Sequence, residues 1–450
     1  MYKRCVIRIV LGCIVLHGFC LVPSSVAGEN ENGPEAAVDI DAWRGRAVDY
    51  GRIMSRLEWT PVADGIPIRG RGEFKANTTY TGVPYSNGGW DGRMIGFDIY
   101  LKTFLAAVEN PQSVLYTRDL RNQRRNSAAF YGMVCSAYTS YSLQLAAQVG
   151  SSFHGPPHRE GIEPAEPQSA QGAQVGDVLW FRGHVELVTR VTTGPDGDVT
   201  HVRVEDSWPP TTRTKNYTAS RFDDYLARRR ATLYRISDYD AWRGGSRAEE
   251  YLFPNYEKDA DPPAINRVVL LDLGDWVAYR KGQPVRFNVM DRDDRGVETL
   301  VIKREGEPVE QIALDGPGIV ERTFERPGDY TAHCIMKDGT ESQACEFSVC
   351  TIDSGPATDP IVLGEPWEVE FRTENMKAIH VRIAQEGDPD YGNLVPHYSI
   401  WLTDEHRREG RVTVPADALA RRGRHSVLVT GENRYGRLRN RHIISVVTPD

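Results

Sequence analysis

Apolar positions in the first third of the chain recur at intervals of three and four residues, as on one face of a helix. Two such runs cover Val38–Leu57 and Phe97–Val108 and predict two amphipathic helices. A third run begins at Cys135 and continues to about Val149, with apolar side chains at Val134, Tyr138, Tyr141 and Leu145. We therefore expect the thiol of Cys135 at the start of a helix.

The pattern then changes to short apolar runs separated by glycine-containing turns. Val178–Phe181, Gly183–Val188 and His201–Asp206 predict three strands of an antiparallel meander. Tyr217–Leu226 is expected to form a short helix and Thr232–Ile236 a closing strand. Helices followed by a small antiparallel sheet predict an α+β fold for this part of the chain.

A second kind of domain follows the proline-containing stretch Asp259–Ala264, which we expect to be a linker. Beyond it the chain consists of short alternating runs and turns, a pattern typical of all-β domains. Gly282–Val289 (GQPVRFNV) matches Gly364–Phe371 (GEPWEVEF), and three further pairs of segments match in the same order. This repeat predicts two immunoglobulin-like sandwiches of about 90 residues each, at 265–352 and 353–450.

The N-terminal end has the pattern of a secretory signal peptide. Lys3 and Arg4 precede a mostly apolar run from Cys5 to Val22, and Pro23–Ala27 supplies a helix breaker and small residues for cleavage. A membrane anchor is the alternative, but the run is short and interrupted by charge. We expect residues 1–27 to be removed and the protein to be exported without a membrane span, into the periplasm, the cell envelope or the medium.

Composition and charge change this picture little. The 450 residues carry a formal net charge of −8, which argues against nucleic acid as a partner. At about 150 residues per domain the length allows roughly three domains. This agrees with an α+β domain at 28–258 followed by two sandwiches. The oligomeric state is left open.

The seven cysteines fall into three groups. Three lie in the expected signal peptide, Cys135 stands alone, and Cys334, Cys345 and Cys350 cluster in the first sandwich. Cys334 and Cys345 flank the turn sequence KDGTE, which predicts a disulfide across a hairpin and leaves Cys350 unassigned. In an oxidising compartment a lone cysteine such as Cys135 is either catalytic or a small buried apolar residue.

Catalysis by cysteine needs a thiolate, a base for its proton and a group that orients the base. Cys135 at a helix start, His184 at the head of a strand and a carboxylate on the next strand supply these types. The carboxylate is Glu205 or Asp206, and since neighbouring residues of a strand point to opposite faces, only one of them can serve. The alternative for His184 is a structural histidine of the sheet.

Three segments between residues 81 and 207 resemble the NlpC family of papain-like bacterial cell-wall peptidases. They are Gly82–Tyr85 with the following Gly-Gly pair, Val134–Ala137 (VCSA) and Gly176–Val185. They are similar to the family's Pro-Tyr turn, its Asp-Cys-Ser-Gly nucleophile segment and its Gly-Asp leader with a His-Val strand. The resemblance implies a papain-like domain at 28–258, in which a helix packs on an antiparallel sheet.

By this resemblance Cys135 would be the nucleophile and His184 the base, with Glu205 preferred over Asp206 as the orienting residue. The backbone N–H of Cys135 would help to hold the oxyanion. The substrate would be a peptide or peptidoglycan. The family suggests the stem peptides of peptidoglycan, particularly the bond between D-glutamate and a diamino acid. No metal and no organic cofactor is implied.

Tyr85 and Ser136 are the residues expected to contact the substrate. The sequence departs from the family pattern at Val134 and Ala137, where the family has aspartate and glycine. The stretch between Tyr85 and Cys135 is also longer than in the family, and we expect this insertion to cover the cleft. Two alternative functions are a catalytically degenerate scaffold that serves as a cell-surface binding or adhesion protein, and an amidase or acyltransferase acting on another substrate.

Overall fold

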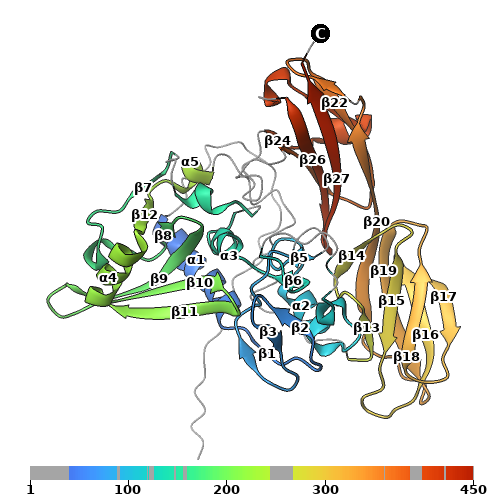
Figure 1. Cartoon of the computed structure of the whole chain (residues 1–450). Coiled ribbons are helices and arrows are strands. Elements are labelled where there is room, and N and C mark those ends of the chain that lie inside the picture. Colours follow the sequence, from blue (N-terminus) through green and yellow to red (C-terminus); the bar gives the residue numbers. More distant parts are fainter. Residues whose placement is uncertain are drawn as a thin grey trace, which may run out of the picture. The chain divides into compact units, whose positions relative to one another are not determined.

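The computed structural model describes residues 40–88, 92–118, 120, 126–145, 148–155, 160–243, 267–358, 360–385, 398–419 and 422–448. The expected signal peptide and the expected linker lie outside these residues. The described chain up to residue 243 mixes helices and strands, and strands dominate from residue 269 onward (Figure 1). The expected order, an α+β region followed by all-β sandwiches, is confirmed at this level.

Three helices precede the main sheet, as the apolar spacing predicts: α1 (Ile40–Ser55), α2 (Leu101–Glu109) and α3 (Cys135–Ser142). The last of them ends earlier than expected, because Gln144 has left-handed backbone (φ 60°) that a right-handed helix cannot contain. Short strands pair between these helices: β1 (Glu58–Trp59) with β4 (Tyr80–Thr81), β2 (Ile66–Ile68) with β3 (Gly72–Phe74), and β5 (Arg93–Met94) with β6 (Tyr131–Gly132). Single 3₁₀ turns lie at Val114–Tyr116, Ser151–His154 and Ala170–Gly172.

The main sheet has the strand order β11-β10-β9-β8-β12-β7, and every pair in it is antiparallel. Its strands are β7 (Ile162–Pro164), β8 (Val178–Phe181), β9 (His184–Thr193), β10 (Val199–Trp208), β11 (Thr211–Thr218) and β12 (Thr232–Ile236). Two helices accompany it, α4 (Ala219–Arg229) and α5 (Tyr239–Arg243). The meander is confirmed, but β11 was not predicted, because its sequence TTRTKNYT has no alternating apolar residues.

Helix α3 is buried on every side, although the sequence pattern indicated one apolar face. All eight of its residues are buried. Two of its hydroxyl groups bond within the helix: Ser140 Oγ donates to the Ser136 carbonyl (2.6 Å) and Ser142 Oγ to the Tyr138 carbonyl (2.9 Å). Helix α1 approaches so closely that a Cβ at Gly51 would lie 2.6 Å from the Tyr138 hydroxyl oxygen. The cysteine therefore begins a central helix.

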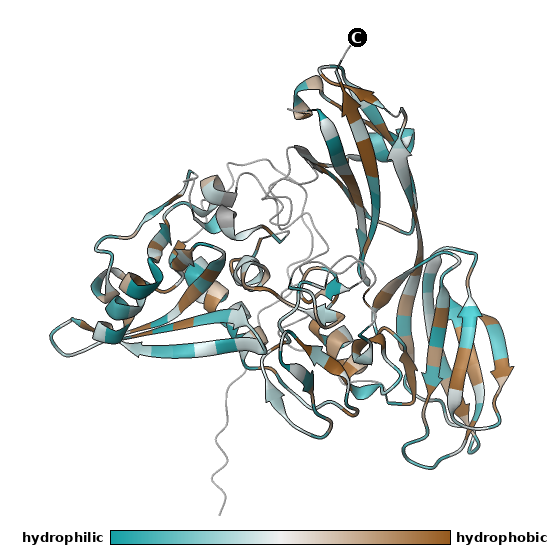
Figure 2. Ribbon diagram, viewed as in Figure 1, coloured by the Kyte–Doolittle hydropathy of each residue, from teal (hydrophilic) through white to brown (hydrophobic). Residues whose placement is uncertain are grey.

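The C-terminal part forms two β-sandwiches with the same strand order in their larger sheets. In the first sandwich the order is β17-β16-β19-β20, with β14 parallel to β20; in the second it is β24-β23-β26-β27, with β21 parallel to β27. Hydrophobic and hydrophilic residues alternate along these strands (Figure 2). The four matching sequence pairs fall on β15/β22, β16/β23, β19/β26 and β20/β27, so the internal repeat is a repeat of structure.

The bounds of these strands are as follows. The first sandwich contains β13 (Val269–Leu271), β14 (Val277–Arg280), β15 (Pro284–Val289), β16 (Val297–Arg304), β17 (Glu307–Ala313), β18 (Gly318–Thr323), β19 (Gly328–Met336) and β20 (Cys345–Pro356). The second contains β21 (Ile361–Val362), β22 (Trp367–Glu374), β23 (Ala378–Gln385), β24 (Tyr398–Trp401), α7 (Asp404–Glu409), β25 (Arg411–Val414), a 3₁₀ turn at Ala416–Ala418, β26 (Gly423–Asn433) and β27 (Gly436–Val447).

One strand joins the two sandwiches without a break. The first part of β20 pairs with β19, and Thr351–Pro356 of the same strand pairs with β22. The boundary expected between residues 352 and 353 therefore falls inside a strand, and no loop separates the sandwiches there.

The insertion expected to cover the cleft contacts the first sandwich. Asn110 donates to the Leu271 carbonyl (3.1 Å) and accepts from the amide of Asn288 (2.5 Å). Thr103 Oγ1 donates to the Trp276 carbonyl (3.1 Å), and the Lys102 ammonium lies 3.0 Å above the indole ring of Trp276. The described part of this insertion thus docks the sandwich onto the α+β region.

The expected disulfide is wrong. Cys334, Cys345 and Cys350 are free, buried thiols. Cys345 pairs across the strands with Ala332, so Cys334 lies two residues further along β19 and is not opposite Cys345. Both side chains belong to the hydrophobic core of the first sandwich.

We therefore expect Cys334, Cys345 and Cys350 to resist alkylation in the folded protein. Burial raises the pKa of Cys334 to about 11 and that of Cys350 to about 12, and it raises that of Cys345 well above its ordinary value. Alkylation after denaturation without reductant, read by intact mass, should modify all three. Adducts that form only after reduction would contradict the free thiols.

Candidate active site

Cys135 is the first residue of α3 and is 8% exposed. Val134 precedes it in extended backbone and provides no side-chain hydrogen bond to the helix start. The first N–H groups of a helix have no partner within the helix. The thiol therefore lies beside backbone donors that could bind a developing negative charge.

His184, the first residue of β9, stands between Cys135 and a carboxylate. Its Nε2 lies 2.7 Å from Asp206 Oδ2, and its ring interacts electrostatically with Cys135. Burial alone lowers the pKa of His184, but the negative charge of Cys135 and the bond to Asp206 outweigh it and raise this pKa well above its ordinary value. The structure thus brings together three of the residues singled out from the sequence.

The preference for Glu205 is corrected, because the two neighbouring carboxylates point to opposite faces of β10. Glu205 Oε2 accepts from the hydroxyls of Ser55 in α1 (2.7 Å) and Tyr138 in α3 (2.9 Å). Asp206, the alternative, is the residue bonded to His184. Glu205 is therefore a buried anchor between strand and helices.

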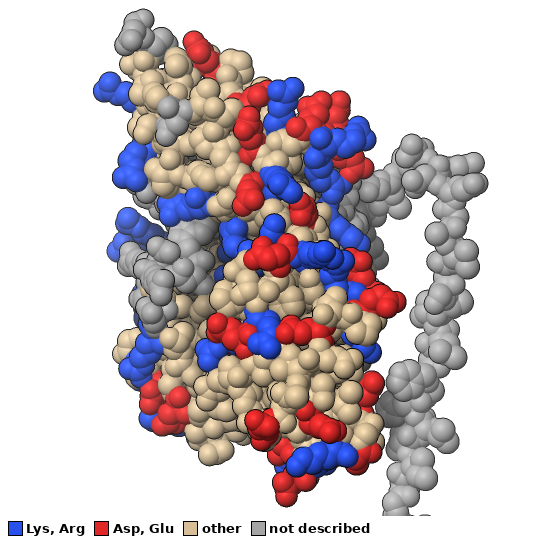
Figure 3. Space-filling model, turned by 90° about the vertical axis from the view of Figure 1, so that its right-hand side faces the viewer, with Lys and Arg blue, Asp and Glu red and all other residues tan. Residues whose placement is uncertain are grey.

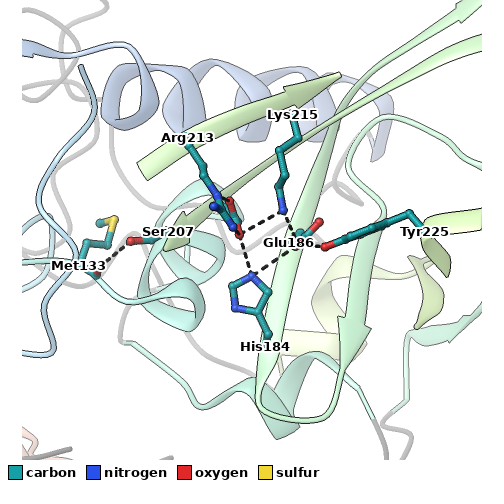
Figure 4. A network of polar contacts seen from close by, with 8 residues as sticks. Met133, His184, Glu186, Ser207, Arg213, Lys215 and Tyr225 are labelled. Carbon is teal, nitrogen blue, oxygen red and sulfur yellow. Dashed lines mark hydrogen bonds and ion pairs between the residues drawn. The ribbon is translucent and has the colours of Figure 1, made fainter. Parts of the chain in front are cut away.

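Four further polar residues belong to the network beside His184, and sequence reasoning missed them: Glu186, Arg213, Lys215 and Tyr225 (Figure 4). Arg213 Nε donates to Asp206 Oδ1 (2.9 Å), and Lys215 Nζ donates to Asp206 Oδ2 (3.2 Å) and Glu186 Oε1 (2.5 Å). Tyr225 of α4 also donates to Glu186 Oε1 (2.6 Å). Arg213 and Lys215 lie on β11, the strand that the sequence pattern did not reveal. Glu186 lies two residues after His184 in β9. Because every second residue of a strand points to the same face, the sequence could have indicated Glu186.

The two carboxyl groups stay ionised despite their burial. Burial raises the pKa of Asp206, but the hydrogen bond from His184, the charge of Lys215 and the bond from Arg213 lower it below its ordinary value. Burial also raises the pKa of Glu186, and the hydrogen bond from His184 and the charge of Lys215 again lower it. The two carboxylates behind the histidine therefore carry negative charge, which Lys215 and Arg213 compensate.

The two expected substrate residues have different surroundings. Tyr85 is buried, forms a bridge to Met133 and donates its N–H to the Pro210 carbonyl (2.9 Å). Burial and the negative charge of Cys135 raise its pKa to about 12, and its hydroxyl accepts from Arg69 Nη1 (3.4 Å). Ser136 follows Cys135 in α3 and is buried.

Two aromatic rings flank the histidine. The ring centroids of Phe181 and Trp208 each lie 5.1 Å from that of His184. Trp208 is 39% exposed and meets the imidazole edge-on. It is a further residue that a substrate could contact at the mouth of the site.

His184, Glu186 and Asp206 are also grouped closely enough to bind a cation. The ammonium of Lys215 already bonds both carboxylates from this position. These residues therefore do not fit a metal ion, and none enters the chemistry considered below.

The surface gives a separate indication about partners. On the face shown in Figure 3, basic and acidic side chains are interspersed, and neither sign forms a continuous patch. This distribution does not favour a polyanion on that face. Among the described residues, no helix is long and apolar enough to cross a membrane.

No protein-family model and no curated protein sequence matches this chain. Solved structures similar to it include the fibronectin(III)-like modules of Clostridium thermocellum CbhA, at 12% identity and a TM-score of 0.18, over 42% of this chain and 93% of that one. The FN1–FN3 domains of chicken CNTN1 match at 8% identity and a TM-score of 0.19, over 64% of this chain and 100% of that one. The C-terminal region resembles fibronectin-III and immunoglobulin-like β-sandwich modules, which agrees with its strand order.

Paired substitutions on β10 test which carboxylate supports the histidine. Asp206→Asn removes a negative charge bonded to His184, so the pKa of the imidazole should fall by about one to three units. Glu205→Gln should leave this pKa unchanged and lower the free energy of unfolding by about 1–3 kcal/mol, because a buried charged anchor is lost.

Two measurements on both variants check these expectations. The pH dependence of Cys135 alkylation by iodoacetamide reports the change at His184, and thermal unfolding reports the change in stability. The assignment is wrong if Glu205→Gln moves the alkylation profile and Asp206→Asn does not.

Proposed function

We propose that this protein is an exported cysteine hydrolase that cleaves amide bonds. The observation that supports this best is the electrostatic interaction of Cys135, at the start of a buried helix, with His184, whose Nε2 is bonded to Asp206. A nucleophile, a base and an orienting carboxylate are the parts that covalent acyl transfer needs.

In the proposed reaction the Cys135 sulfur attacks the amide carbonyl, and the oxyanion binds the N–H groups at the start of α3. The C–N bond then breaks, and the proton held by His184 goes to the leaving amine. A water molecule, deprotonated by His184, attacks the resulting thioester. The acid product leaves and the thiol is restored.

The resemblance to NlpC-type papain-like peptidases suggests the substrate. The arrangement of α3 against an antiparallel sheet that carries His184 and Asp206 is consistent with a papain-like domain. We propose that the substrate is a peptide stem of peptidoglycan, cleaved next to D-glutamate, and that residues 1–27 direct the protein out of the cytoplasm.

A binding or adhesion protein is the second candidate, because two sandwiches follow the α+β region and together span residues 269–447. In that case the site would be a degenerate scaffold. An amidase or acyltransferase with another substrate would keep the chemistry and change only the acyl group or the acceptor.

Digestion of purified peptidoglycan fragments by wild type, Cys135→Ala and Cys350→Ala tests the proposal. Wild type should release new amino groups, and Cys135→Ala should lose this activity by at least about 10³-fold, because the thioester cannot form. Cys350→Ala is the matched control: it removes a buried thiol of the sandwiches, and activity should persist.

The products distinguish the candidates. Equal product patterns from wild type and Cys135→Ala would contradict peptidoglycan hydrolysis. Failure of iodoacetamide to label Cys135 near neutral pH in the folded protein would contradict enzymatic function altogether and favour the binding protein.

A further inference from the structure

A second carboxylate approaches the histidine from its own strand. Glu186 Oε1 lies 3.5 Å from His184 Nε2, the nitrogen that Asp206 contacts at 2.7 Å. Both carboxylates are fully buried. An orienting role needs only one carboxylate, so Glu186 requires a separate explanation.

Two buried carboxylates this close would normally share a proton, because like charges in one site raise the pKa of one group. Lys215 prevents this by donating to Glu186 Oε1 and Asp206 Oδ2 at 2.5 and 3.2 Å. The Tyr225 hydroxyl adds a second donor to Glu186 Oε1, while Glu186 Oε2 has no hydrogen-bond partner among the described residues. Because Glu186 Oε2 lacks such a partner, hydrogen bonding alone does not account for the position of this side chain.

Charged and titratable groups around His184 come from several elements. They are Glu186 of β9, Asp206 of β10, Arg213, Lys215 and Tyr217 of β11, Cys135 of α3, Tyr225 of α4 and Tyr85. Two carboxylates balance Arg213 and Lys215, so the imidazolium of His184 forms beside a set of groups without net charge. With Glu186 neutral, the same set would carry one excess positive charge, and the imidazolium would be disfavoured.

We propose that Glu186 is a positioning residue that keeps His184 protonated at neutral pH, through its negative charge beside Nε2 and with Lys215 as its counterion. This inference rests on the proposed function, because a protonated histidine supplies the proton that the leaving amine needs. It makes Glu186 a second contributor to the charge state of the base beside Asp206, which also fixes the orientation of the ring.

The direction of the effect follows from the charge. Replacing Glu186 by glutamine keeps the size and an acceptor for Lys215 and Tyr225 but removes one negative charge near the imidazolium. The pKa of His184 should fall by about one unit. Glu186→Asp keeps the charge but withdraws it by one methylene, so the fall should have the same sign and be smaller.

The measurement is an NMR titration of protein labelled at the histidine ring carbons, with the His184 signal assigned by its loss in His184→Gln. Wild type should titrate well above 6.5, Glu186→Asp lower and Glu186→Gln lowest. Glu432→Gln is the matched control, because Glu432 is fully buried against Arg437 in the second sandwich (2.9 Å), and its His184 titration should equal that of wild type.

The outcomes separate this inference from the proposed function. If Cys135 reacts with iodoacetamide and the His184 midpoint is the same in wild type and in a folded Glu186 variant, the role of Glu186 is wrong and the hydrolase proposal stands. If Cys135 does not react in wild type, the hydrolase proposal fails first. Should Glu186→Gln not fold, Glu186→Asp carries the test, and an unmoved midpoint there contradicts the inference.

Discussion

The alternation of side chains along β10 is the constraint on which the site depends. Glu205 and Asp206 are neighbours, so a strand directs them to opposite faces. On one face Glu205 accepts hydrogen bonds from Ser55 of α1 and Tyr138 of α3, and on the other face Asp206 is bonded to His184. The same two residues thus fix the helix that begins at Cys135 and the ring of His184. A shift of β10 by one residue would exchange these faces and dismantle both arrangements at once.

Buried charge is tolerated here because it is compensated over very short distances. Two carboxylates, a lysine and an arginine lie behind the imidazole, and each described ionic contact among them is 3.5 Å or shorter. An uncompensated charge in such a place would change its protonation state. The network instead keeps Asp206 and Glu186 ionised, because Lys215 bonds both carboxylates and Arg213 bonds Asp206.

Sequence patterns were sufficient for the parts of the fold that depend on local spacing. The helix start at Cys135, the strand head at His184 and the repeat of two sandwiches all follow from apolar periodicity and turns. The choice between Glu205 and Asp206 could not be made from the sequence. The pairing of β9 with β10 shifts between Arg203 and Val204, and the spacing of residues cannot reveal such an irregularity. The polar strand β11, which supplies Arg213 and Lys215, carries no apolar signal. The mistaken disulfide likewise depended on a strand register.

The first sandwich also contributes to the placement of Cys135. The segment that leads into α3 is fastened on two sides: the Tyr131 hydroxyl donates to the Leu273 carbonyl of the first sandwich, and the Met133 carbonyl accepts from Ser207 of β10 (2.6 Å). Cys135 follows two residues later. Because Tyr131 is fully buried, its ring and hydroxyl fix the backbone of this segment. The first sandwich is thus part of the support of the site, and its removal would free one side of the chain that presents the thiol.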